Sequence, residues 1–195
     1  MSTPRRRTRR GGSLPLSLAG SVLVAHPSMQ DANFRETLVY ISIHDADGAM
    51  GIILNRPMAG ETLGKWAEKP ERFAAIAGLP MLWGGPVHPN RLMFWAAFRA
   101  PKGPGMHGVF GISMEDATKL SADAPHASVA AVLGHASWTA GQLEQELKQD
   151  TWLIAPAASL PTLWLPAASM YRSTLRLINP VLAFTYGGPE DPQAN

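Results

Sequence analysis

The sequence predicts an α+β fold, in which strands and helices are mixed without a regular strand–helix–strand rhythm. Short apolar runs rich in β-branched residues alternate with turns that contain Pro or Gly, which is typical of strands. Segments with helical periodicity are fewer and lie between these strands at irregular intervals. The chain has 195 residues, of which 46% are apolar, so it is long enough to form one domain with its own core.

The strands are predicted from apolar runs that end at residues unsuited to a sheet. The run at 21–27 ends in a proline, and the run at 50–55 is followed by Arg56 and Pro57, which matters because proline cannot donate to a sheet ladder. The predicted strands are 21–27, 37–44, 50–55, 80–87, 92–98, 109–114, 128–137 and 151–156. The segment 28–36 suits a loop or a single helical turn, and 100–108 is a loop by composition.

The clearest predicted helix is 139–150. Thr139 and Gln142 have the spacing of a capping box, and Glu144 and Lys148 have the spacing of an i,i+4 ion pair. The other predicted helices are a weak one at 61–78 that Pro70 divides, one that begins after Ser113 as N-cap, and an amphipathic one at 166–178.

The basic residues are concentrated at the N-terminus. The net charge is +2, but without the arginines of the first ten residues the rest has 12 basic against 15 acidic residues, or −3. The tail can contact nucleic acid or an anionic surface weakly, or it can be an extension without a specific partner. A mildly acidic body argues against a duplex-binding domain. The arginines are Arg5, Arg6, Arg7, Arg9 and Arg10.

The N-terminal segment has two interpretations. Its arginines followed by an apolar segment suit a secretion or twin-arginine export signal, although Pro15 and Gly20 interrupt the apolar part. Alternatively, 1–13 is a disordered tail, 14–186 is one domain, and 187–195 is a second disordered tail. No apolar stretch reaches the roughly 18 residues of a transmembrane helix. The absence of cysteine excludes disulfides and is compatible with a reducing compartment, so we expect a cytoplasmic location.

The segment "HDADG" (44–48) has the composition of a metal loop but not its spacing. A calcium loop needs an acidic residue at its twelfth position, and counting from Asp45 reaches Arg56. Two apolar strands joined through Asp47 and Gly48 predict a hairpin instead. The histidines have no H-x-x-x-H spacing, and those outside the strands are expected to be solvated in loops. The sequence therefore predicts no metal and no cofactor.

Two further patterns are open to a chemical interpretation. Ser28 near His26, and Ser137 near His135, could serve a hydrolase, although "GHASW" lacks the second glycine of a nucleophile elbow. The glycines of "GGP" (84–86) could bind an anion through their N–H groups, but a tight turn after a strand explains them as well. No catalytic residue is assigned.

Three separated motifs resemble those of the YqgE/AlgH family of bacterial proteins: "GSVLVAHPSMQDANFRETLVYISIHDADGAMGIILNRP", "LWGGPVHPNR" and "GHASWTAGQLEQEL". Their order and spacing match the family over 18–178. The resemblance implies a compact α+β domain in which a bent, barrel-like mixed sheet carries helices on its outside. It also implies that 21–27 is the opening strand of the domain, which makes the basic tail an extension.

The resemblance implies a candidate ligand or partner site rather than a catalytic one. Family members are described as uncharacterised, and some as transcriptional regulators. This implies a non-enzymatic binding or regulatory protein whose partner, a protein or a small ligand, is unknown. A direct DNA-binding regulator and a hydrolase remain alternatives. The recurring family positions are Asp31, Phe34, Arg35, His44, Asn55, Arg56, Gly84, Gly85, Trp138 and Gln142.

Several of these positions have a structural interpretation. Asp31 and Arg35 can pair across one helical turn, Asn55 can bind backbone groups at a strand end, and Gln142 can cap a helix. The sequence also departs from the family, because Ile43 stands where an acidic residue is frequent and Trp95-Ala96 where Leu-His is frequent. Both departures argue against a shared enzyme mechanism.

Overall fold

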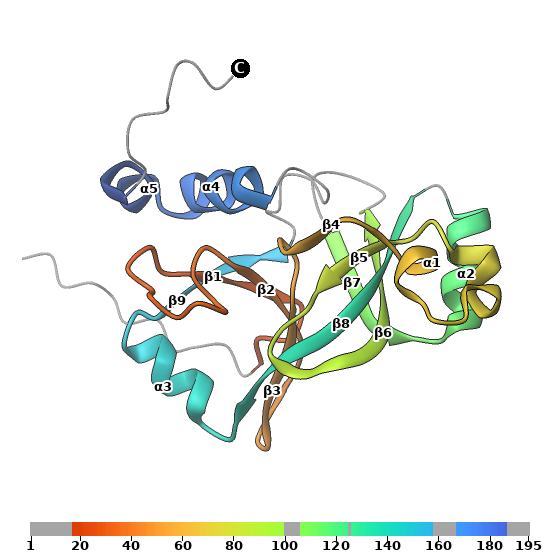
Figure 1. Ribbon diagram of the computed structural model, residues 1–195. Coiled ribbons are helices and arrows are strands. Elements are labelled where there is room, and N and C mark those ends of the chain that lie inside the picture. Colours follow the sequence, from red (N-terminus) through yellow and green to blue (C-terminus); the bar gives the residue numbers. More distant parts are fainter. Residues whose placement is uncertain (1–16, 100–105, 125, 158–166, 187–195) are drawn as a thin grey trace, which may run out of the picture.

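The computed structural model describes residues 17–99, 106–124, 126–157 and 167–186 (Figure 1). The predicted tails 1–13 and 187–195, with the five tail arginines, lie outside these residues. The strands are β1 (Ser21–Ala25), β2 (Leu38–Asp45), β3 (Gly48–Ile53), β4 (Pro57–Thr62), β5 (Pro80–Trp83), β6 (Val87–Arg99), β7 (Met106–Ile112), β8 (Ala127–Thr139) and β9 (Trp152–Pro156). The helices are α1 (Leu63–Trp66), the 3₁₀ helix η1 (Pro70–Ile76), α2 (Met114–Asp123), α3 (Gln142–Lys148), α4 (Ala167–Ile178) and α5 (Pro180–Tyr186).

One mixed nine-stranded sheet organises the molecule and confirms the α+β class. Its order is β4-β5-β8-β3-β2-β1-β9, and β6 and β7 branch from β8. The long strand β8 connects the two parts, because its first part pairs with β5 and β6 while its last residues, Ala136 to Thr139, pair with β3. Only the β5–β8 pair is parallel among the described strands. The order has two ends, β4 and β9, and the sheet does not close, so the predicted barrel-like shape is not confirmed.

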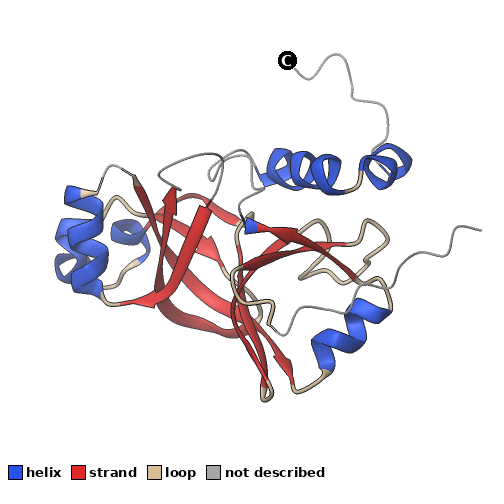
Figure 2. Ribbon diagram, turned by 180° about the vertical axis from the view of Figure 1, so that it is seen from behind, coloured by secondary structure: helices blue, strands red, loops and turns tan. Residues whose placement is uncertain are grey.

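Two apolar clusters lie on the two parts of the sheet. The larger one contains β1, which is buried almost completely as its continuous apolar run predicts, together with Trp95 and Tyr171. The smaller one joins Leu63 of α1 and Ala117 of α2 to the strands of the other part. Helices cover the outside of the strands at separate places (Figure 2).

Local sequence signals placed several boundaries correctly. Pro70 divides the helical segment into α1 and η1, and the Ser113 hydroxyl caps α2 by accepting the Asp116 N–H at 3.0 Å. The helix predicted at 139–150 is shorter, because β8 continues to Thr139 and α3 begins after Gly141. Half of the capping box is formed, since Gln142 Oε1 accepts the Thr139 N–H at 3.1 Å. The Thr139 hydroxyl donates to the same oxygen at 3.2 Å instead of accepting a backbone N–H of α3, whose N-cap is Gly141.

The structure has regular elements at three places where the sequence does not predict them. β3 ends before Arg56 and Pro57, as the sequence predicts, but Pro57 then opens β4, an end strand of the order, where a first-position proline needs no ladder N–H. In the loop predicted at 100–108, residues 106–108 belong to β7. Residues 100–105 lie outside the residues that the structure describes. The helix α5 was not predicted. It begins at Pro180, and Asn179 Oδ1 accepts the Leu182 N–H at 3.1 Å.

Tyr171 connects α4 to the sheet through a hydrogen bond. We expect the free energy of unfolding to depend on pH where its hydroxyl titrates. Its hydroxyl donates to the Ala25 carbonyl at 2.8 Å, and burial, with a smaller contribution from Glu36, raises the pKa of Tyr171 to about 12 from 10.0. Because the folded pKa lies above the unfolded one, this stabilisation is complete below pH 10 and lost as the pH rises toward 12.

The variant Tyr171→Phe tests this link. We expect it to lower the free energy of unfolding by about 1 kcal/mol at pH 8, because the buried carbonyl loses its donor. Urea unfolding at pH 8 and between pH 10 and 12 should show a shallower alkaline loss for the variant than for the parent. Equal alkaline slopes for both proteins would contradict the assignment.

Candidate functional site

The recurring positions do not form one cluster; each is tied to nearby backbone or to a neighbouring side chain. Asp31 shapes the turn before β2, since its Oδ1 accepts the N–H groups of Asn33 at 2.8 Å and Phe34 at 3.2 Å. The Arg35 N–H donates to the Asp31 carbonyl at 2.8 Å. The predicted pairing of the Asp31 and Arg35 side chains is therefore wrong, because the carboxylate serves the turn.

Asn55 and Arg56 attach this turn to the strand ends. Asn55 is 2% exposed; its Oδ1 accepts the Leu38 N–H at 2.8 Å and its Nδ2 donates to the Glu36 carbonyl at 2.8 Å. Arg56 donates from its guanidinium to the Arg35 carbonyl at 2.7 Å. The predicted role of Asn55 in satisfying backbone groups is confirmed.

Replacing Asn55 with alanine should lower the free energy of unfolding by about 2–3 kcal/mol. The buried Leu38 N–H would lose its acceptor, and the turn would lose its attachment to β2. Chemical denaturation measures the change, with Asn90→Ala as control because Asn90 is exposed. An Asn55→Ala protein as stable as the control would refute the structural role.

His44 of β2 connects α3 to the segment that precedes β1. Its Nδ1 accepts the Leu18 N–H at 2.9 Å and its Nε2 lies 2.8 Å from Glu144 Oε1, while its side chain is only 6% exposed. Because Nδ1 accepts, Nε2 carries the proton and donates to the carboxylate. The pKa of Glu144 is lowered, first by its own backbone N–H and then by His44 and Lys148. Glu144 thus bonds to His44, and Lys148 acts on its carboxylate through charge alone, without the close ion pair that the sequence predicts.

Trp138 belongs to an aromatic cluster around a carboxylate that sequence reasoning missed. Glu146 Oε2 accepts the indole N–H of Trp138 at 2.9 Å and of Trp152 at 2.8 Å, and Gln142 donates to Oε1 at 2.9 Å. The Trp138 and Trp152 rings meet edge to face at 6.0 Å, and Phe34 packs against both. The signal that could have identified Glu146 is its i,i+4 spacing from Gln142, together with the need of buried indoles for an acceptor.

Gly84 and Gly85 serve strand packing. The Gly84 N–H donates to the Leu133 carbonyl at 2.7 Å, and its carbonyl accepts the Ile53 N–H at 2.9 Å. The Gly84 N–H is therefore directed at β8 and not at a ligand, which argues against the anion nest. The predicted tight turn is not formed either: residues 84–86 have no turn, and Gly84 bonds to the strands on both sides.

The hairpin between β2 and β3 is confirmed, with a shifted turn. Asp45 pairs with Gly48, so Ala46 and Asp47 form the loop, and Asp45 Oδ1 accepts the Asp47 N–H at 2.9 Å. Gly48 is required for packing, because a Cβ there would lie 2.1 Å from the Trp138 carbonyl oxygen. Within the described part of the chain, no group of three or more His, Cys, Asp or Glu residues could hold a metal ion.

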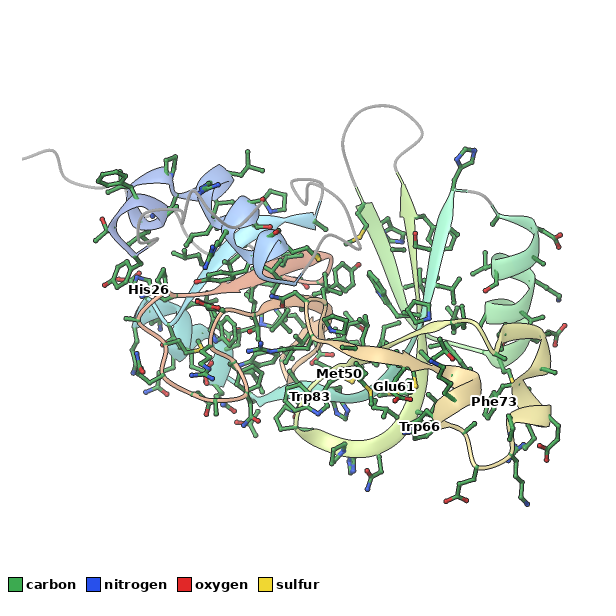
Figure 3. All side chains as sticks on the ribbon, turned by 45° about the horizontal axis from the view of Figure 1, so that its top comes forward. His26, Met50, Glu61, Trp66, Phe73 and Trp83 are labelled. Carbon is green, nitrogen blue, oxygen red and sulfur yellow. The ribbon has the colours of Figure 1, made fainter. Side chains whose placement is uncertain are left out.

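The structure brings only part of the hydrolase alternative together. His26 Nδ1 lies 2.7 Å from the Ser28 hydroxyl, but the neighbouring Asp31 carboxylate is bonded to the turn N–H groups. His26 also contacts Tyr186 ring to edge at 5.8 Å, and Figure 3 labels it beside α5. A histidine oriented by a buried acid, which triad chemistry needs, is not formed there.

A protein-family model described as AlgH-like matches residues 22–183. The chain belongs to the AlgH-like family. A UPF0301 protein of Azoarcus sp. is 38% identical over 151 residues, which cover 72% of this chain and 78% of that protein. The UPF0301 protein YqgE of Escherichia coli is 32% identical over 173 residues, covering 84% and 92%. These matches confirm the resemblance to the YqgE/AlgH family.

Solved structures agree with the fold of this AlgH-like chain. The solution structure of the AlgH protein from Pseudomonas aeruginosa has a TM-score of 0.61 at 29% identity, covering 86% of this chain and 91% of that one. A crystal structure of a Corynebacterium diphtheriae protein has a TM-score of 0.57 at 21% identity, covering 86% and 90%, and supports the fold alone. No described helix of the AlgH-like chain is long and apolar enough to cross a membrane.

Proposed function

We propose that this AlgH-like protein is a non-enzymatic binding protein that docks an acidic, apolar segment of a partner protein on α4 and α5. The observation that supports this proposal is a set of exposed apolar side chains on these helices, here called the outer row: Leu177, Val181 and Phe184. Their exposed fractions are 60%, 74% and 89%. Large apolar side chains gathered on a surface are typical of protein-contact sites. The regulatory role and the cytoplasmic location expected from the sequence are parts of this proposal.

The two helices have an inner and an outer face. On the inner face, Met170, Tyr171 and Leu175 are buried in the larger apolar cluster, and Leu182 packs against it. The outer row spans both helices: Leu177 lies on α4, and Val181 and Phe184, three residues apart, lie on one side of α5. The row is therefore available on helices that the core already holds in place.

The positive charge of α4 favours an acidic partner protein. The segment 167–186 has no acidic residue, and Arg172 is exposed on it. A partner segment that carries Asp or Glu around apolar anchors complements this surface, whereas two copies of it face to face would bring arginines together. We therefore favour a different, acidic protein over a second copy.

The candidate polar positions support binding over catalysis. His44 uses both ring nitrogens on Leu18 and Glu144, and the carboxylate of Glu146 is held by two indoles and by Gln142. These groups maintain the fold that presents the helices.

Site-specific photo-crosslinking in the bacterium that encodes the protein tests the proposal. A photoreactive phenylalanine analogue at position 184 of the full chain should give one discrete adduct whose attached peptide is rich in Asp and Glu. The control position is Met114, which is apolar and 45% exposed on α2. Arg172→Glu should reduce the adduct severalfold, because the charge complementarity is reversed.

Three outcomes would overturn the docking proposal: no adduct at 184, an equal adduct at 114, or an adduct to a second copy of the chain. An attached peptide without acidic residues, or a yield that Arg172→Glu leaves unchanged, would contradict the assigned partner chemistry.

A further inference from the structure

The start of β6 departs from regular pairing. Val87 pairs with His135 and Leu92 with Leu133, so residues 88–91 of β6 lie opposite Gly134 alone. His88, in this bulge, has a φ of +48°, which is left-handed and costly for a residue other than glycine. Bulges re-aim side chains, and strained backbone concentrates at functional positions.

The bulge places the His88 ring against a buried histidine, and the charge of Arg91 acts on the same histidine. His135 is 8% exposed, and its Nδ1 is buried without a hydrogen-bond partner in the described structure. The ring centroids of His88 and His135 are 5.7 Å apart, with the planes inclined by 32°. Burial lowers the pKa of His135, and the nearby cationic groups of His88 and Arg91 lower it further. The sequence had suggested an isolated, solvated His88, so this grouping is a finding of the fold.

We propose that His88, Arg91 and His135 form a binding site for the phosphate group of a small ligand. Each of the three side chains can donate N–H groups, and a phosphate offers several oxygens to separate donors, whereas a carboxylate offers two. A bound anion would offset the repulsion between the cationic groups and give the His135 ring a partner. The arginine disfavours a cation, and no described acidic cluster surrounds the histidines.

The access to this site depends on an exposed side chain. His88 and Arg91 are exposed and His88 lies over the His135 ring, so the His88 side chain can turn aside without unpacking the core. The connection from β5 to β6 lies on the side of the molecule away from α4 and α5 (Figure 1). The phosphate site is therefore independent of the proposed docking surface.

Titration calorimetry of the full chain with inorganic phosphate tests the site, combined with NMR of the histidine rings. We expect saturable binding, a shift of the His135 ring signals, and binding about tenfold weaker in His88→Ala and in Arg91→Gln, since each loses a charge-assisted bond. Both variants change exposed residues, and their melting temperatures check that folding is preserved. His126→Ala and Arg72→Gln, which change exposed residues elsewhere, should bind as the parent does.

Acetate and sulfate distinguish the ligand chemistry. Sulfate should compete with phosphate because it has the same tetrahedral oxygens, and acetate should bind at least about tenfold more weakly because it satisfies fewer donors. Three results would overturn the proposal. They are the absence of saturable phosphate binding, phosphate binding by His88→Ala and Arg91→Gln as tight as by the parent, and acetate binding as tight as phosphate binding. Phosphate binding that persists in Leu177→Asp would show that the site stands apart from the docking surface, and its loss there would contradict that independence.

Discussion

Replacing Glu146 with alanine is expected to lower the free energy of unfolding by about 3 kcal/mol. The carboxylate accepts both indole N–H groups, and Trp138 and Trp152 are only 6% and 4% exposed. Removing the acceptor leaves two buried donors unsatisfied, and each costs about 1–3 kcal/mol. Urea denaturation followed by tryptophan fluorescence measures both the stability and the environment of the two rings.

Two further variants distinguish the role of the Glu146 carboxylate from a general loss of stability caused by any substitution on α3. Glu146→Gln keeps an oxygen acceptor and should lose less than half as much stability, while Gln145→Ala, at an exposed neighbour, should be nearly neutral. Adding Trp138→Phe to Glu146→Ala should cost less than the sum of the two changes, by about 1–2 kcal/mol, because the orphaned N–H is removed as well. Strict additivity would show that Glu146 does not act through Trp138.

Replacing Gly85 with alanine should be at least as damaging, at about 3 kcal/mol or more. A Cβ at Gly85 would lie 2.4 Å from the carbonyl carbon and oxygen of His135 and 2.6 Å from the Ala136 nitrogen, all backbone atoms. The φ of +147° adds conformational strain for any residue with a side chain. Because β8 cannot retreat without disturbing its pairing with β6, the clash has to be relieved by moving the strands.

Gly78→Ala is the matched control for Gly85→Ala. No heavy atom lies within 4 Å of the Cβ that it would add, and its φ is outside the left-handed region, so we expect a change within about 0.5 kcal/mol. Thermal unfolding of both variants gives the comparison. Similar melting temperatures for the two proteins would contradict the close approach of the strands.

Much of the fold could be predicted because its signals are local. The runs that form β1, β2 and β3 are apolar. Pro70 cannot stand inside a helix and opens η1 instead, and the Ser113 cap depends on a bond to Asp116 three residues later. β4 escaped prediction because it is a mostly exposed end strand without an apolar pattern. The parallel pairing of β5 with β8 is a contact between distant segments that no local pattern encodes.

At the candidate site, too, local contacts could be predicted from the sequence and contacts between distant segments could not. The role of Asn55 followed from its position at a strand end, and the structure bears it out. The bond between His44 and Glu144 joins residues 100 positions apart, and the contact between His88 and His135 depends on a bulge. Neither partnership has a signature in one sequence. Glu146 was overlooked because a glutamate on a helix is ordinarily a solvated residue.

The central claim is that the protein acts through the outer row on α4 and α5. The most direct test compares the transcripts and interaction partners of three strains of the bacterium: a deletion strain, one carrying Phe184→Asp, and one carrying Met114→Asp, which changes an exposed apolar residue elsewhere. We expect Phe184→Asp to reproduce the changes of the deletion at an unaltered melting temperature of the purified protein, and Met114→Asp to resemble the parent. A Phe184→Asp strain indistinguishable from the parent, beside a deletion strain that differs, would contradict the claim.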